Sequence, residues 1–101
     1  MIEKLASIKQ RFEEIGQLIV QPDAMADMKG YTKLNQEYRQ LEKIVLKYDA
    51  WTNATNNLKN TKTLLAAEKD EEFRALAKSE IETLVPLIDQ LNDEIKVLLI
   101  P

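Results

Sequence analysis

Cysteine and histidine are both absent from the 101 residues of the chain. The absence of cysteine excludes disulfides and thiolate metal sites, and the absence of histidine removes the usual proton shuttle near neutral pH. Only two glycines and three prolines are present, so turns must be few and the elements between them long. No apolar run approaches the ~20 residues that a membrane span needs. We therefore expect one small, helical, cytoplasmic domain.

Charge is distributed unevenly along the chain, whose net charge is −3. Residues 1–20 carry equal numbers of acids and bases, residues 21–66 carry an excess of two bases, and residues 67–101 carry an excess of five acids. A nucleic-acid-binding surface would need a clear basic excess. The pattern is more typical of helices of opposite charge that lie side by side, and no sequence-specific nucleic-acid binding is expected.

Apolar residues spaced alternately three and four positions apart predict three amphipathic helices. The predicted helices cover about residues 2–20, 28–66 and 71–99 of a single domain, 1–101. The residues that form the stripe of the last helix are Ala77, Ile81, Leu84, Ile88, Leu91, Ile95 and Leu98. Short connections make successive helices antiparallel. The expected fold is all-α, an up-down-up three-helix bundle in which the second and third helices extend as a hairpin beyond the shorter first one.

Helix-terminating and capping residues support these boundaries. Pro22 disfavours helical geometry at the residue before it, so the first helix should end there. Asp27 is the expected N-cap of the second helix, after Asp23 caps a short turn, and Asp70 is the expected N-cap of the third. Pro86 falls on the outward face of the third helix, where we expect a kink and no break.

The segment TNATNNLKNTKT that follows Trp51 is rich in residues that form helices poorly. The apolar stripe also shifts there, and continues through Trp51, Leu58 and Leu65. A change of packing partner beyond the end of the first helix explains both observations. The alternative is that the second helix breaks within this segment.

No catalytic, cofactor-binding or metal-ligating residues are predicted, and we expect neither an enzyme nor a cofactor. Glu71 and Glu72 suit the first turn of a helix, where the helix dipole stabilises acids. The acidic residues at 92–94 are interpreted as a solvated face. Trp51 more often closes the end of a core at such a position than it forms a binding hot spot. The pattern assigns no residue to partner binding.

Three segments of the sequence resemble bacterial class I peptide chain release factors, in the order that this family has. The first is YTKLNQEYRQLEKIVLKYDAW, at 31–51, and the second is DEEFRALAKSEIETL, at 70–84. The third, LNDEIKVLLIP, resembles the end of the family's helix before its linker, in the release factor 1 type. The matching positions are Leu34, Glu37, Tyr38, Leu41, Ile44, Val45, Tyr48, Trp51, Asp70, Ala77, Glu80 and Ile81.

This resemblance implies that the chain is the N-terminal helical domain of a larger translation termination factor. A full-length member recognises stop codons on the ribosome and promotes release of the nascent peptide. Its codon-reading tripeptide and Gly-Gly-Gln motif do not occur in these residues. The implied partners are the stalk base of the large ribosomal subunit and a GTPase release factor. The alternative from another class is a free-standing coiled-coil adaptor, which a gene without a downstream Gly-Gly-Gln motif would favour.

Overall fold

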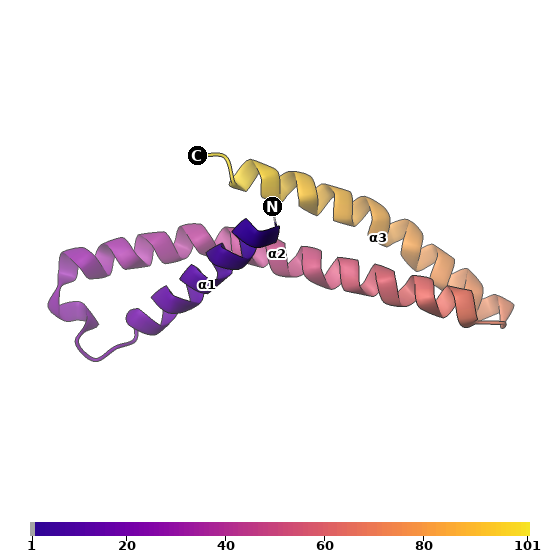
Figure 1. Cartoon of the computed structure of the whole chain (residues 1–101), viewed down its shortest axis with the longest axis horizontal. Coiled ribbons are helices and arrows are strands. Elements are labelled where there is room, and N and C mark those ends of the chain that lie inside the picture. The colour runs from indigo at the N-terminus through magenta and orange to yellow at the C-terminus, as the bar shows by residue number, and fades with distance from the viewer. Residues whose placement is uncertain (1) are drawn as a thin grey trace. The chain divides into compact units, whose positions relative to one another are not determined.

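A computed structural model describes the chain from Ile2 to Pro101 and confirms the predicted all-α class. The order of elements is α1 (Ile2–Leu18), the short 3₁₀ helix η1 (Ala24–Ala26), α2 (Met28–Ala67) and α3 (Glu71–Leu98) (Figure 1). The described residues contain no strand and no helix that is both long and apolar enough to cross a membrane.

The chain divides into two compact units, one ending at Leu46 and the other comprising Lys47–Pro101. Helix α2 is continuous and contributes its first part to one unit and its remainder to the other. The Asn- and Thr-rich segment after Trp51 is therefore helical, and the alternative of a break within it is wrong. Tertiary packing overrides the weak helix propensity of these residues.

The first unit is a helical hairpin of α1 and the beginning of α2. Phe12 of α1 stacks on Tyr38 of α2, with ring centroids 4.4 Å apart. Ile15 is fully buried, as expected of a residue on the predicted stripe. Asp27 caps α2, because its Oδ1 accepts a hydrogen bond from the Gly30 amide at 3.1 Å. The predicted cap at Asp27 is confirmed.

Asp23 behaves differently from its prediction as a side-chain cap. It precedes η1, but its side chain makes no capping hydrogen bond there, and its backbone carbonyl accepts the Ala26 amide instead. A 3₁₀ turn of three residues closes with one such i→i+3 bond. The side chain is therefore not needed to close the turn.

The second unit is an antiparallel hairpin of α2 and α3 around a continuous seam. Its buried cluster consists of Ala54, Leu84 and Leu91, and the partly buried Trp51, Leu58 and Ile88 pack against it. The shifted stripe predicted for α2 is thus the face that meets α3. Trp51 packs against this core, in agreement with the prediction that it closes the end of a core. It also stacks on Tyr48, with ring centroids 6.3 Å apart.

Pro86 lies within α3, which continues through it. The residue is exposed, on the outward side of the helix where the heptad count places it. Because the missing amide faces solvent there, water can satisfy the carbonyl that loses its partner. The predicted continuity of the third helix is confirmed.

Candidate docking surfaces

The connection between α2 and α3 is fixed by a compact set of hydrogen bonds. Asp70 is the N-cap of α3, and its Oδ1 accepts the amides of Glu72 and Phe73 at 2.9 and 3.2 Å. On the other side of the turn, Glu68 Oε1 accepts the Asp70 amide at 3.0 Å. The predicted cap at Asp70 is confirmed, and three residues suffice to reverse the chain.

Arg74 joins the two helices at this same end of the second unit. Its Nη1 donates to the carbonyl of Leu65 at 2.6 Å and to the carbonyl of Glu68 at 3.0 Å. The Leu65 carbonyl is one of the last four of α2, which have no partner within the helix. A cation from α3 thus caps the C-terminus of α2, where the helix dipole favours positive charge.

Apolar side chains are exposed beside this rigid turn. Leu64, Phe73 and Leu76 have exposed fractions of 50%, 59% and 62%. Leu64 and Phe73 each precede a seam position, and in an antiparallel pair these positions flank the seam on the same side. Leu76 lies one turn after Phe73 and is its neighbour on the surface of α3. We call Leu64, Phe73 and Leu76 the tip patch.

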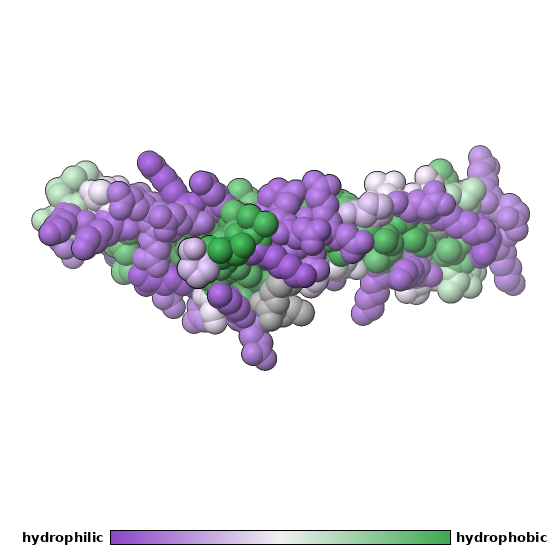
Figure 2. Space-filling view, turned by 90° about the horizontal axis from the view of Figure 1, so that it is seen from above, coloured by the Kyte–Doolittle hydropathy of each residue, from purple (hydrophilic) through white to green (hydrophobic). Residues whose placement is uncertain are grey.

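Acidic residues lie close to the tip patch in the sequence, together with one base, Lys69. Glu68 and Asp70 lie in or next to the connection, and Glu71 and Glu72 occupy the exposed first turn of α3. Figure 2 shows apolar surface among hydrophilic surface on the second unit, towards this end. An apolar centre with a charged rim is the usual anatomy of a protein–protein interface. The arrangement suits a partner with an apolar pocket and basic residues around it.

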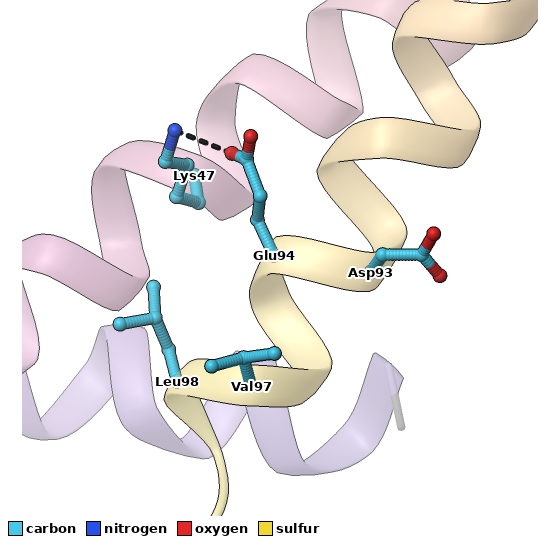
Figure 3. Close-up of a pocket in the computed structure, with 5 residues that line it drawn as sticks. All are labelled: Lys47, Asp93, Glu94, Val97 and Leu98. Carbon is cyan, nitrogen blue, oxygen red and sulfur yellow. Dashed lines mark ion pairs between the residues drawn. The ribbon is translucent and has the colours of Figure 1, made fainter.

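A hollow of the same unit lies near the end of α3, with a volume of about 390 Å³. Lys47, Asp93, Glu94, Val97 and Leu98 line it (Figure 3). Lys47 Nζ lies 2.5 Å from Glu94 Oε2, and Gln90 donates to Oε1 of the same carboxylate at 2.9 Å. The hydrogen bond from Lys47 lowers the pKa of Glu94 most, and the hydrogen bond from Gln90 lowers it further.

The predicted solvated face at 92–94 is therefore only partly right. Asp93 is exposed and points away from the ion pair (Figure 3), whereas Glu94 is partly buried and joins α3 to α2. This pair is an instance of the charge complementarity that the sequence indicated between neighbouring helices. Its role is to hold the hairpin, because both ionic groups are used by each other.

Helices α1 and α2 of the first unit are joined by a two-pronged ion pair. Arg11 Nε and Nη2 donate to the two carboxylate oxygens of Glu37 at 2.9 and 3.1 Å. The hydrogen bond and the charge of Glu37 raise the pKa of Arg11, and the hydrogen bond from Arg11 lowers the pKa of Glu37. Glu37, one of the residues that carry the family resemblance, thus has a structural contact.

Candidate metal ligands among residues 2–101 are limited to carboxylates, because the chain has no cysteine and no histidine. No group of three or more acidic residues is gathered there in a way that could hold a metal ion. The exposed carboxylates of Glu71 and Glu72 lie in the first turn of α3, where the helix dipole accounts for them.

The tip patch could have been found from the sequence by one signal. Phe73 and Leu76 are apolar but lie outside the stripe that predicts the seam of α3. Apolar residues on the outer face of a hairpin have no core to enter. The apolar pattern predicted most of the seam but missed Ala54 and Thr61, which are both buried. A small side chain and a polar one do not contribute to an apolar periodicity.

The sequence of the chain matches known proteins over its whole length. Residues 8–101 match the family model described as the PCRF domain. Peptide chain release factor 1 of Cytophaga hutchinsonii and that of Amoebophilus asiaticus are each 46% identical to it over 101 residues. Peptide chain release factor 1 of Flavobacterium psychrophilum is 40% identical over the same length. The chain covers 28% of the length of each of these relatives.

No solved structure matches the chain. The sequence relationships are nevertheless sufficient, since the family model covers most of the chain and the relatives align from its first residue to its last. They agree with the resemblance carried by the segments at 31–51 and 70–84. The chain belongs to the PCRF domain family, and the relatives to which it is similar are named peptide chain release factor 1.

Proposed function

We propose that this chain is the N-terminal docking module of a translation termination factor. In this proposal the full-length protein acts in the cytoplasm, recognises stop codons on the ribosome and promotes release of the nascent peptide. The observation that carries the proposal is the match of residues 8–101 to the PCRF domain, together with 46% identity to release factor 1 relatives. Codon reading and peptide release belong to parts of the protein outside these residues.

The proposed partners of this module are the stalk base of the large ribosomal subunit and a GTPase release factor. The tip patch supports a docking role, because it joins exposed apolar side chains to an acidic rim on a turn that is already ordered. An ordered turn loses little conformational entropy on binding, so more of the contact energy appears as affinity. We assign the tip patch to contact with the proteins of this region.

Binding of the 101-residue chain to isolated large and small ribosomal subunits tests the proposal. Sedimentation should show the chain with large subunits and not with small ones. A Phe73→Ser, Leu76→Ser double variant should lower this binding at least ~10-fold, since a buried aromatic anchor is worth 2 kcal/mol or more in an interface. Val85→Ser with Leu87→Ser is the matched control, because both are exposed apolar residues of α3 away from the tip.

Two results would contradict this proposal at different levels. Equal losses in the tip and control variants would remove the tip patch as the contact and leave the family role intact. A gene that encodes no Gly-Gly-Gln motif after these residues would contradict the termination role itself and favour the coiled-coil adaptor.

A further inference from the structure

The part of α2 that belongs to the first unit has a distinct polar face. Within residues 28–46 of this helix there are four bases and two acids. One of the acids, Glu37, is bound by Arg11 on the side that meets α1. The four bases are Lys29, Lys33, Arg39 and Lys43, and all of them are exposed.

These four cations lie on the side of α2 away from α1. Tyr38, which stacks on Phe12 and approaches Gly16, marks the side of α2 that meets α1. At 100° per residue, the opposite side of the helix carries the four bases together with Thr32, Gln36 and Gln40. We call these seven residues the cationic face. Figure 2 shows mostly hydrophilic surface on the first unit.

The charges of the cationic face are not used within the described structure. Over residues 2–101, none of its four bases forms an ion pair, whereas Arg11 and Lys47 each have a carboxylate partner. Glu42, at the edge of the face, is the acid closest to it along the helix. The basic excess of residues 21–66 is therefore explained only in part by pairing between neighbouring helices.

A groove of about 400 Å³ runs along the edge of this face. Its lining consists of Met28, Tyr31, Thr32, Asn35, Gln36 and Arg39. Asn35 Nδ2 donates to the Tyr31 carbonyl and Thr32 Oγ1 donates to the Met28 carbonyl, so both side chains are held against the helix. Thr32 thereby uses its one hydroxyl proton, whereas Tyr31, Gln36 and Arg39 are of the types that donate to phosphate and sugar in nucleic-acid complexes.

We propose that the cationic face binds the phosphate backbone of RNA, without reading its sequence. Lys29 and Lys43 are about 21 Å apart along the helix at 1.5 Å per residue, so the cations can follow several consecutive phosphates. None of the seven residues of the face is apolar or aromatic, so its centre offers a protein partner no such anchor; Met28 and Tyr31 lie at its edge. The choice of RNA over DNA rests on the proposed function at the ribosome.

The salt dependence of binding gives the proposal a quantitative form. Each phosphate neutralised by a cation lowers log K by about 0.9 for each unit of log salt concentration. Four contacts then weaken binding on the order of 100-fold between about 50 and 200 mM salt. An RNA duplex of about 20 base pairs is long enough to cover the ~21 Å of the face.

The experiment is an NMR titration of the isotopically labelled 101-residue chain with this RNA duplex at the two salt concentrations. We expect the amide resonances of residues 28–43 to shift and saturate, with the predicted loss of affinity at the higher salt. The variant with Lys29, Lys33, Arg39 and Lys43 all changed to Gln should lose saturable binding. The matched control changes the same number of exposed bases of the second unit to Gln, namely Lys59, Lys62, Lys69 and Lys78.

Circular dichroism of both variants checks that they remain helical. If the fourfold variant does not remain helical, the double variant Lys29→Gln, Lys33→Gln replaces it in the titration. Absence of shifts at 28–43, or an equal loss of binding in the control, would overturn the proposal. Equally tight binding of poly-glutamate would also overturn it, in favour of an acidic protein. None of these results would affect the binding of the tip patch to large subunits, so the two proposals fail independently.

Discussion

Replacing Arg74 by Met should destabilise the turn between α2 and α3. Methionine keeps the apolar stem and the helix propensity of arginine but removes the hydrogen bonds to the Leu65 and Glu68 carbonyls. A hydrogen bond from a charged group contributes about 1.5–3 kcal/mol when it is shielded from water. Arg74 is only partly buried, so we place the loss from both bonds at about 1.5 kcal/mol.

The assay is thermal unfolding followed by circular dichroism, with amide hydrogen exchange as a local readout. For a domain of this size 1 kcal/mol corresponds to about 4–8 °C in Tm, so Arg74→Met should lower Tm by roughly 6–12 °C. Lys78→Met, an exposed position one turn along α3, is the control and should stay within about 0.5 kcal/mol of the parent. Exchange should accelerate around the turn, at 64–73, more than at 51–58.

The reasoning would be refuted by equal Tm changes in Arg74→Met and Lys78→Met. It would also be refuted by unchanged exchange at 64–73, because the carbonyl contacts of Arg74 would then contribute nothing to the order of the turn. An Arg74→Met variant that is destabilised and also binds large ribosomal subunits more weakly would connect the order of the turn to docking.

Three further predictions concern the two hairpins. Leu91→Ala should cost about 2–5 kcal/mol in urea unfolding, whereas Leu87→Ala, on the exposed side of α3, should cost much less. Ala54→Leu should cost about 1–3 kcal/mol in the same assay, because Ala54 lies in the close-packed cluster; an unchanged midpoint would show that the seam has spare room. Glu37→Gln should reduce the loss of stability in acid. The pKa of Glu37 is lowered below 4.5 in the folded state, so its contribution is present above that pH and is lost as the pH falls through the folded pKa; identical acid unfolding curves for the parent and the variant would contradict this.

Much of the fold follows from local patterns in the sequence. The three-four spacing identified the seam of α3, since Ala77, Leu84, Leu91 and Ile95 are all buried. The caps at Asp27 and Asp70 could be predicted from the sequence, because a carboxylate directly before a helix accepts hydrogen bonds from the free amides of the first turn. These features depend on residues that are close together in the sequence.

The features that the sequence did not reveal depend on contacts between distant residues. Arg74 occupies a seam position and looks like an interruption of the stripe, yet it caps the other helix of the hairpin. The shift of the apolar stripe after Trp51 predicted that α2 changes its packing partner, but not that the compact units divide at Leu46. Periodicity along one helix indicates a change of partner and does not give the bounds of the units that result.

Surface function in a helical chain is carried by residues that the fold does not require. Packing requires apolar residues at the seam positions, whereas the other positions need only be polar enough to keep the protein soluble. An exposed Phe73 or a row of cations without ion pairs is therefore not explained by packing. The tip patch and the cationic face are two such departures, and their chemistry is opposite: apolar with an acidic rim in one, basic and polar in the other. An RNA backbone is repelled by the first and attracted by the second, whereas a basic protein surface has the reverse preference. The two proposals therefore assign different partners to the two surfaces, and variants that exchange charge at one surface should leave binding at the other unchanged.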